Sequence, residues 1–341
     1  MRHWQLTPLD QTPGLVLREA APPVPARGQL RLRMLAASLN YRDLLVLRRT
    51  YAARPDYAPI IPLSDGVGIV DAVGSGVERV KVGERVASTF MPGWIDGEFS
   101  PEKAASALGG GRVDGVLGEY VVVPAEGLVR VPAHLSDEEA ATLPCAAVTA
   151  WYALFEGNRI LPGDTVLAIG SGGVSLFVLQ FARMAGARVV ATTGSADKIA
   201  RLRELGAEAV WDSRSNADWA QAVTAWTGGR GVDLAVDVAG PDTFNRTLQA
   251  VRVGGAVSLM GVLSGVEGPV STGSILMKQI RVQGTNVGSR AMFERMNRAI
   301  EANGLRPVVD RVFAFEEAEE ALRYLESGRH LGKVCIRIGA R

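Results

Sequence analysis

The sequence predicts an α/β protein of two domains, one rich in short β-strands and one with a doubly wound parallel sheet. Two observations indicate this. The chain has 341 residues, and a domain usually takes roughly 150 residues, so two domains are expected. The pattern also changes near Pro144. Short strands broken by glycine and proline precede this point, and strands alternating with helices follow it.

The first 125 residues have the pattern of an antiparallel barrel. In residues 29–36 leucine and methionine alternate with arginine, which predicts a strand with one solvent-facing side. In residues 65–86 glycines recur among valine and isoleucine pairs. Glycine supplies the positive φ angles that tight turns between such strands need.

The second part predicts a parallel sheet buried on both faces. Residues 165–169 form a short apolar run that leads into glycines and then into a helical pattern ending at Gly186. A strand at 189–191 and a helix at 198–205 follow, and further β-rich stretches lie at 232–238, 256–260 and 280–283. Strands that alternate with helices in this way are typical of βαβ units.

From about residue 293 the pattern is mixed again. We expect a helix at 293–302, a strand at 310–313, a helix at 315–326 and a closing strand at 332–338. This tail is expected to return to the first domain. The predicted division is therefore residues 1–125 with 293–341 in the β-rich domain and residues 126–292 in the parallel-sheet domain.

Composition excludes several classes of function. The 37 basic and 36 acidic residues nearly cancel, which argues against a nucleic-acid or anionic membrane partner. No apolar run approaches the roughly 18 residues of a membrane span, and the N-terminus lacks the apolar core of a signal peptide, so a cytoplasmic protein is expected. Two cysteines exclude a disulfide framework.

A glycine-rich turn after the strand at 165–169 is the strongest motif in the chain. The strand leads directly into a turn, and a helix follows; the turn comprises Gly170, Ser171, Gly172, Gly173, Val174 and Ser175. Gly170 permits the tight bend, and Gly172 allows the backbone to approach a pyrophosphate at the helix N-terminus. Ser175 stands where glycine or alanine is usual. This strand–turn–helix arrangement predicts a dinucleotide-binding Rossmann domain.

The end of the second strand favours NADP(H) over NAD(H). An NAD site usually has Asp or Glu there to bind the ribose 2′-hydroxyl. This chain instead has Thr193, Gly194 and Ser195, followed by Lys198 and Arg201. Hydroxyls and a cation suit a 2′-phosphate. The alternative is that Lys198 and Arg201 only form the solvated face of a helix.

Four stretches resemble the medium-chain dehydrogenase/reductase superfamily over nearly the whole chain. "SLNYRDLLVLRRTY" and "PLSDGVGIVDAVGSGVERVKVGERV" are similar to its GroES-like domain. "LPCAAVTAWYAL" with "GDTVLAIGSGGVSLFVLQFA" resembles the entry into its Rossmann domain, and "GTNVGSRAMFERM" its segment near the nicotinamide. The resemblance implies a GroES-like catalytic domain, an inserted cofactor domain with a cleft between the two, and a homodimer.

Zinc enzymes of this superfamily carry ligands that this chain lacks. Their first cysteine falls in residues 41–43, which contain none, and their His-Glu pair is replaced by Ser64 and Asp65. Cys145 alone stands where a later ligand is found, and we interpret it as a packed thiol. Residues 91–115, where the structural-zinc cysteines belong, have no cysteine. The resemblance therefore implies that both zinc ions are absent.

Without a Lewis acid, hydride acceptors whose charge can be delocalised are favoured, such as quinones and α,β-unsaturated carbonyls. The chain looks most similar to the zinc-free, quinone-oxidoreductase-like branch. Candidate hydrogen-bond or proton donors and their partners are Asn40, Tyr41, Asp43, Tyr51 and Asp65. Two alternatives stay open: the tyrosines are packing aromatics, and Asp43 caps a helix that begins at Leu44.

On the cofactor side, the positions that match the family around ribose and nicotinamide are Thr149, Ala239, Gly240, Gly261, Val262, Asn286 and Val287. Ser213 and Arg214 could close over the adenine or form a surface turn. The sequence thus predicts an NADPH-dependent reductase of quinones or enones without zinc. Two rivals remain: an alcohol or aldehyde dehydrogenase, and a nucleotide-binding protein without catalytic activity.

Overall fold

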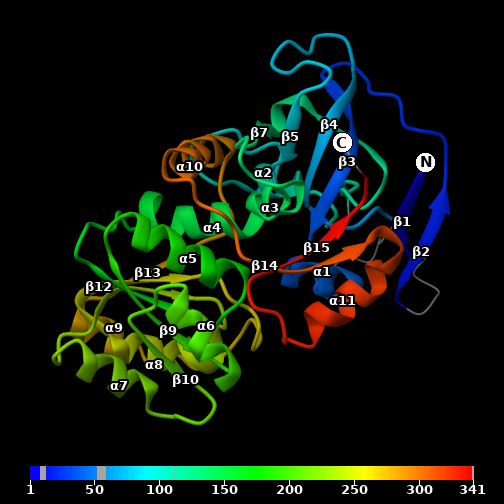
Figure 1. Cartoon of the computed structure of the whole chain (residues 1–341). Helices are drawn as coiled ribbons and strands as arrows, with labels where there is room; N and C mark the ends of the chain where they lie inside the picture. Colours follow the sequence, from blue (N-terminus) through cyan, green and yellow to red (C-terminus); the bar gives the residue numbers. More distant parts are fainter. Residues whose placement is uncertain (8–12, 52–58, 111, 340–341) are drawn as a thin grey trace. The chain divides into compact units, whose positions relative to one another are not determined.

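The computed structural model describes residues 1–7, 13–51, 59–110 and 112–339. The chain divides into two compact units (Figure 1). Unit 1 comprises Met1–Val148 and Val287–Arg341, and unit 2 comprises Thr149–Asn286. Unit 2 is thus inserted into the chain of unit 1.

The units divide at other positions than residues 125 and 292. After residue 125 the chain still adds to the sheet of unit 1, because β7 (Leu128–Arg130) pairs with β5 (Arg85–Ser88). Helix α3 (Asp137–Ala141) then packs on the same sheet. On the return side, α10 (Arg290–Asn303) contacts β7, so unit 1 resumes before the predicted residue 293.

Unit 1 is built on a seven-stranded sheet with the strand order β14-β15-β3-β4-β5-β7, and β6 also pairs with β3. The central strands are β3 (Gln29–Ser38) and β4 (Asp65–Val73), which pair antiparallel. The C-terminal tail supplies β14 (Val309–Ala314) and β15 (Lys333–Arg337), and β15 pairs antiparallel with β3. The remaining elements of this unit that bear on the site are β2 (Leu15–Glu19), β6 (Tyr120–Pro124), α1 (Tyr41–Leu47) and α11 (Ala318–Glu326).

Alternation along β3 explains how the core of unit 1 forms. Leu30, Leu32 and Met34 are at most 1% exposed, whereas Arg31 and Arg33 between them are half-buried. The predicted one-sided strand is confirmed. After Met34 the strand is buried on both sides as far as Ser38, and this fully buried end leads into the polar residues described below.

Unit 2 contains a six-stranded parallel sheet with the order β10-β9-β8-β11-β12-β13. Its strands are β8 (Thr165–Ile169), β9 (Arg188–Thr193), β10 (Ala209–Asp212), β11 (Val232–Asp237), β12 (Val251–Leu259) and β13 (Arg281–Gly284). From β8 the chain builds outward to β9 on one side and later to β11 on the other. The carboxyl end of β8 therefore lies at the switch point where open α/β sheets bind ligands.

Helices cover both faces of this sheet. One apolar core joins α7 (Trp219–Trp226) and α8 (Pro241–Ala250) to the strands. Helix α5 (Gly173–Met184) contributes none of its buried residues to that core and packs on β8 and β9. Figure 1 shows α7, α8 and α9 (Thr272–Lys278) grouped together. No helix in the described part of the chain is long and apolar enough to cross a membrane.

Candidate cofactor and active site

The glycine-rich turn has the shape that a pyrophosphate requires. Strand β8 ends at Ile169 and helix α5 begins at Gly173. Gly170 has φ +87°, in the region that favours glycine, and a Cβ added at Gly172 would meet nothing within 4 Å. Gly172 caps α5 without a side-chain hydrogen bond, so the helix N-terminus is open to an anionic ligand.

Ser175 keeps the helix close to the strand although it replaces the usual glycine. Its hydroxyl donates to the carbonyl oxygen of Ile169 at 2.7 Å. The side chain is 2% exposed, so it fills the contact between α5 and β8. The turn thus fits a dinucleotide through space at Gly172, with Ser175 as part of the packing.

Hydroxyls and the guanidinium of Arg214 lie at the end of β9. Thr193 and Ser171 are joined through their hydroxyls at 3.4 Å, and the backbone N–H of Ser195 donates to the Thr193 hydroxyl at 3.3 Å. Arg214 lies over Gly194, with its Nε 3.3 Å from the position of an added Cβ. The Arg214 side chain therefore reaches the predicted 2′-phosphate position.

Lys198 and Arg201, the two cations predicted after β9, differ from each other in exposure. Lys198 is half-buried at the end of the short helix Ala196–Lys198. Arg201 is exposed and pairs with Glu204 at 2.8 Å, which agrees with the alternative of a solvated helix face for this residue.

Asp237, at the end of β11, organises the turn that holds Ala239 and Gly240, and sequence reasoning missed it. Its buried carboxylate accepts the backbone N–H groups of Ala239 and Gly240, each at 3.0 Å. It also accepts the hydroxyls of Thr243 and Thr247 at 2.9 and 2.7 Å. The N–H groups of Ala239 and Gly240 therefore already donate to a protein side chain. The signal was available, since an acid ended a β-rich stretch three residues before Gly240.

Gly261 is fixed by close backbone contact. An added Cβ would lie 1.8 Å from the carbonyl carbon of Val238, so the loop after β12 presses against the turn that holds Ala239. Val262, the next residue, is 37% exposed.

The predicted residues at the borders of unit 2 include a strained one. Val287 is 5% exposed and has φ +55°, which is an outlier for a β-branched residue. Such strain is concentrated at ligand sites and switch regions. Asn286 beside it is exposed, and Thr149, the first residue of unit 2, is buried.

In unit 1, three neighbouring strands bring polar residues together. Ser38 at the end of β3 lies opposite Asp65 of β4 on one side and Cys335 of β15 on the other. Two residues beyond Ser38, Asn40 therefore meets Lys333, two residues before Cys335. The Lys333 ammonium donates to Asn40 Oδ1 at 2.7 Å and also to the carbonyl oxygen of Leu39.

Asp65 is held by its neighbours through both carboxylate oxygens. The hydroxyl of Ser64 donates to Oδ1 at 2.7 Å, and the backbone N–H of Cys145 donates to Oδ2 at 3.0 Å. Burial raises the pKa of Asp65, and the charge of Lys333 opposes this rise. The charge of Lys333 thus offsets part of the cost of burying a carboxylate that is 0% exposed.

A second buried pair lies next to the first. Arg42 is 8% exposed, and its Nε is 3.8 Å from Asp43 Oδ1. Burial raises the pKa of Asp43 to about 6, and the Arg42 charge and a backbone hydrogen bond from Asn40 act against this rise. We refer to Asn40, Arg42, Asp43, Asp65 and Lys333 as the buried polar cluster.

Of the five predicted catalytic residues, three belong to the buried polar cluster and two lie outside it. Asn40, Asp43 and Asp65 are members. The Tyr51 ring lies against the Arg42 guanidinium, 5.0 Å from its centroid, and so borders the cluster. Tyr41 lies beside Arg48, whose pKa is raised mainly by its hydrogen bond to Glu326 and to a smaller extent by Tyr41.

The helix that Asp43 was expected to cap begins earlier than Leu44. Helix α1 starts at Tyr41, and Asn40 is its N-terminal cap residue. Asp43 accepts the backbone N–H of Asn40 at 2.7 Å, so it stabilises the helix start from within the first turn. The residue has both a capping contact and a place in the buried polar cluster.

Backbone strain places Ser64 and Asp65. Leu63 is 1% exposed and has φ +68°. Gly109 and Gly115 pack against its backbone so closely that added Cβ atoms would lie 2.4 and 1.9 Å from the Leu63 carbonyl oxygen. The glycine-rich loop after residue 108 thus serves as the support of this strained turn.

The side chains of Asp65 and Cys145, which stand where zinc ligands occur in related enzymes, do not fit a zinc ion. Both oxygens of Asp65 already accept hydrogen bonds, and the ammonium of Lys333 lies where a second cation would be repelled. Burial raises the pKa of the Cys145 thiol far above its usual value, which disfavours the thiolate that zinc binds. The described part of the chain holds no group of three His, Cys, Asp or Glu residues that could ligate a metal ion.

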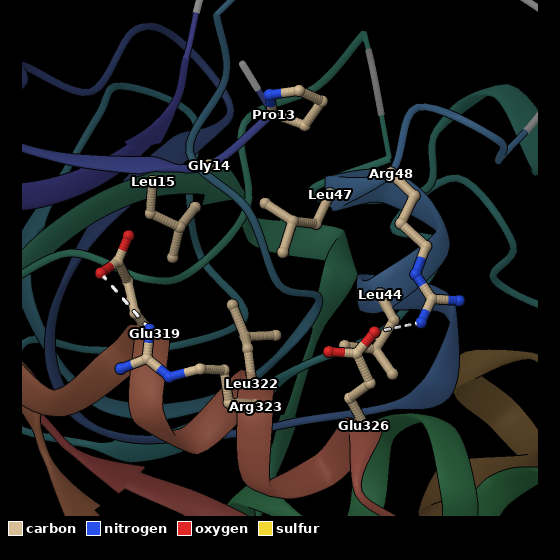
Figure 2. A pocket seen from close by; sticks show the side chains of 10 residues that line it. All are labelled: Pro13, Gly14, Leu15, Leu44, Leu47, Arg48, Glu319, Leu322, Arg323 and Glu326. Atoms are coloured by element: carbon tan, nitrogen blue, oxygen red, sulfur yellow. Dashed lines mark hydrogen bonds and ion pairs between the residues drawn. The ribbon is translucent and has the colours of Figure 1, made fainter.

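A hollow of about 240 Å³ elsewhere in unit 1 contains none of the predicted site residues (Figure 2). Leucines from β2, α1 and α11 line it, and its charged rim forms the pairs Arg48–Glu326 and Arg323–Glu319. These charges balance each other.

The chain matches two protein-family models. Residues 26–133 match the alcohol dehydrogenase GroES-like domain, and residues 173–302 match zinc-binding dehydrogenase. The chain is 40% identical over 318 residues to the zinc-type alcohol dehydrogenase-like protein of Schizosaccharomyces pombe, with 91% of each chain covered. The chain belongs to the medium-chain dehydrogenase/reductase superfamily. It is an NAD(P)H-dependent oxidoreductase of this superfamily, with the predicted GroES-like and Rossmann domains.

Further relatives indicate which chemistry the superfamily includes near this chain. It is 29% identical over 333 residues to acryloyl-coenzyme A reductase of Metallosphaera sedula, with 95% and 96% of the two chains covered. A structure of a candidate alcohol dehydrogenase from Sinorhizobium meliloti 1021 has a TM-score of 0.92 at 40% identity, covering 99% and 98%. A 2-octenoyl-CoA carboxylase reductase in complex with NADP and 2-octenoyl-CoA has a TM-score of 0.84 at 27% identity, covering 98% and 87%.

Proposed function

We propose that this oxidoreductase uses NADPH to reduce α,β-unsaturated carbonyl compounds or quinones without zinc. The observation that carries the proposal is the buried polar cluster at the end of β3. It offers a lysine ammonium, an amide and fully hydrogen-bonded Asp65 where a metal-dependent relative needs free ligands.

The class of acceptor follows from how charge develops during hydride addition. When hydride adds to the β-carbon of an enone, negative charge moves to the carbonyl oxygen, and hydrogen-bond donors can stabilise it. Relatives named acryloyl-coenzyme A reductase and 2-octenoyl-CoA carboxylase reductase carry conjugated thioesters in their names. Conjugated carbonyls are therefore the first acceptors to test, and quinones the second.

The residues of unit 2 fit NADPH. The turn at Gly170–Ser175 would hold the pyrophosphate, and Thr193, Ser195 and Arg214 would hold the 2′-phosphate. When bound, NADPH supplies the hydride. The chain itself contributes the open helix N-terminus at Gly172 and the guanidinium over Gly194.

In unit 1 the chain contributes Asn40 as the donor for the carbonyl oxygen of the acceptor. Its amide is held within the buried polar cluster, where low polarity strengthens each hydrogen bond. Two carboxylates of the cluster hold backbone N–H groups: Asp43 accepts the N–H of Asn40 itself, and Asp65 accepts the N–H of Cys145.

A screen of NADPH oxidation tests the proposal. Purified protein is assayed with enones, conjugated thioesters, quinones, aldehydes and ketones, and its metal content is measured. We expect turnover of enones or quinones, with no stoichiometric zinc and no loss of activity with a chelator. Zinc with chelator-sensitive alcohol oxidation would support the alcohol dehydrogenase instead, and cofactor binding without any turnover would support a non-catalytic protein.

We also propose a homodimer formed through the edge of the sheet in unit 2. Strand β13 is the last strand of that sheet, and its residue Val282 is 39% exposed. In α9, the helix that precedes β13 in the chain and packs on β12, Leu276 and Met277 are 75% and 79% exposed. Large apolar side chains beside a sheet edge favour burial against a second copy.

A further inference from the structure

The loop after β10 carries the Arg214 guanidinium to the end of the neighbouring strand β9. The Arg214 side chain is exposed, so a ligand can reach it. Its stem lies over Gly194: a Cβ added there would be 3.3 Å from Nε and 3.8 and 3.9 Å from Cγ and Cδ. Because Gly194 has no side chain, the guanidinium lies directly over the backbone that follows β9. This is the position of the 2′-phosphate in the proposed function.

Asp212, the last residue of β10, fixes the backbone of this loop. Its Oδ1 accepts the backbone N–H of Arg214 at 2.9 Å, and its Oδ2 accepts the hydroxyl of Ser215 at 2.9 Å. An aspartate that accepts the N–H two residues later closes a tight turn. These hydrogen bonds, first of all the one from Arg214, lower the pKa of Asp212, so the carboxylate stays ionised at neutral pH.

Ser213 ties the same loop to β9. Its backbone N–H and its hydroxyl both donate to the carbonyl oxygen of Thr193, at 2.8 and 3.1 Å. Asp212 and Thr193 are partners in the parallel pairing of β10 with β9, so the loop begins at a fixed place beside Gly194. The backbone around Arg214 is therefore held at three successive residues, from 213 to 215.

We propose that Asp212 is a positioning residue for cofactor recognition, acting through Arg214. By holding the loop before the cofactor binds, it lowers the entropy cost of ordering the guanidinium against the 2′-phosphate. NADH has no 2′-phosphate, so its binding does not depend on Arg214. The inference rests on the proposed use of NADPH, and it adds a residue that determines how strongly NADPH is preferred to NADH.

The charge of Asp212 acts in the opposite direction to its hydrogen bonds. A carboxylate beside Arg214 repels a phosphate that binds to the same guanidinium. The positioning role predicts that loss of the hydrogen bonds outweighs loss of this repulsion. Asparagine separates the two effects, because its amide is neutral and its oxygen can still accept the N–H of Arg214.

Fluorescence titrations of each variant with NADPH and with NADH test the inference. Asp212→Ala should raise the Kd for NADPH about three- to fivefold and change the Kd for NADH by less than about twofold. Asp212→Asn should keep the Kd for NADPH within about twofold of the original. Asp212→Ala combined with Arg214→Ala should bind NADPH as weakly as Arg214→Ala alone, because the side chain that Asp212 positions is gone.

Asp218→Ala is the matched control. Asp218 is an exposed carboxylate at the start of α7, and its side chain makes no capping hydrogen bond. Its removal changes the net charge as Asp212→Ala does but leaves the turn at Arg214 intact, so both Kd values should stay within about twofold of the original. Both cofactors are titrated into the same sample, so partial unfolding of a variant does not change the ratio of the two Kd values.

The outcomes separate the inference from the proposed function. If the unaltered protein binds NADH as tightly as NADPH, the proposed cofactor is wrong and the inference fails with it. If NADPH is preferred, three results contradict the inference alone: an unchanged Kd for NADPH in Asp212→Ala, equal losses for both cofactors, or losses that multiply in the double variant. Tighter binding of NADPH by both Asp212→Ala and Asp212→Asn would also overturn it, since Asp212 would then act only by repulsion. A selective loss that asparagine restores, and that is absent once Arg214 is alanine, supports it.

Discussion

At the scale of single residues, the site in unit 1 depends on balanced buried charges. Arg42, Asp43, Asp65 and Lys333 are between 0% and 8% exposed, and two cations face two carboxylates. Removing one member would leave another charge buried without its partner, which costs more than the pair itself contributes. Substitutions in this cluster are therefore most informative when one cation and one carboxylate are removed together, so that no buried charge loses its partner.

Asp43 should make the stability of the protein depend on pH. Its pKa is raised to about 6 by burial, although Arg42 and Lys333 oppose and Asp65 adds to the rise. The folded protein therefore binds this proton more tightly than the unfolded chain. Stability should fall by up to about 3 kcal/mol as the pH rises from about 4 to about 6, and then stay level.

Asp43→Asn should remove this dependence, because an amide has no proton to lose and can still accept the Asn40 N–H. Urea unfolding of both proteins between pH 4 and pH 8 measures it. The free energies of unfolding should move apart by about 3 kcal/mol across the range. A constant difference at every pH would mean that Asp43 titrates normally.

Arg214 should determine the preference for NADPH. Its guanidinium lies over Gly194, at the predicted 2′-phosphate position. Arg214→Ala should weaken NADPH binding about tenfold, close to 1.4 kcal/mol, and leave NADH nearly unchanged. Fluorescence titration with both cofactors measures the two Kd values.

Lys198→Ala is expected to act in the same direction as Arg214→Ala. Arg201→Ala is the control, because that guanidinium is exposed and pairs with Glu204. Equal losses for NADPH and NADH in the Arg214 variant would show that Arg214 does not contact the 2′-phosphate.

At the scale of elements, the sequence predicts the limits of a strand best where every residue of that strand is buried. The run of residues 165–169 is strand β8, residue for residue, because all five residues of this parallel strand are buried and the glycine-rich turn follows at once. The strand at 29–36 was also predicted, but the structure extends it to Ser38. Those last two residues are buried on both sides, so the alternation that marked the strand had ended.

Contacts between distant segments were not predictable from the sequence. Lys333 meets Asn40 through strand pairing, and Arg214 reaches Gly194 across two neighbouring strands. The strain at Leu63 was also invisible, because leucine rarely adopts positive φ and only the surrounding glycines hold it there. Local patterns therefore predicted the elements and the glycine-rich turn, but not the side chains that meet between elements.

The turn between β8 and α5 makes a sharp test of the cofactor site. A Cβ at Gly172 would meet nothing within 4 Å in the protein, so Gly172→Ala should leave Tm within a few degrees of the original. The same methyl group would occupy the space that a pyrophosphate needs. NADPH binding should therefore weaken by more than about tenfold, as measured by calorimetric titration.

Gly273→Ala is the control for Gly172→Ala. Gly273 lies in α9 with nothing within 4 Å of an added Cβ, so alanine should be tolerated there and should leave binding unchanged. If Gly172→Ala binds NADPH as tightly as the original protein, the phosphate does not lie against this turn.

At the scale of the whole molecule, the chain leaves unit 1 after Val148 and returns at Val287. The returning chain supplies Lys333 to the site, so unit 1 cannot complete its buried polar cluster from its first segment alone. The inserted unit 2 holds the phosphate turn and a sheet that ends in β13. The proposed cofactor binding and the proposed self-association therefore belong to the same unit.

The proposed dimer can be tested by charging the sheet edge. Leu276→Asp with Met277→Asp places two carboxylates on side chains that are 75% and 79% exposed, so a single copy should fold normally. Their burial against a second copy would cost several kcal/mol, because ionised groups resist removal from water. Light scattering should give about 72 kDa for the original protein, twice the 36.2 kDa of one chain.

The charged variant should have the mass of one chain and retain NADPH binding, since neither substitution lies at the phosphate turn. Val24→Asp is the matched control: Val24 is 85% exposed but lies in unit 1, so the mass should stay that of a dimer. A charged variant that remains dimeric would place the interface elsewhere. An original protein with the mass of one chain would reject the dimer, and the apolar side chains beside β13 would then be open to solvent in the working enzyme.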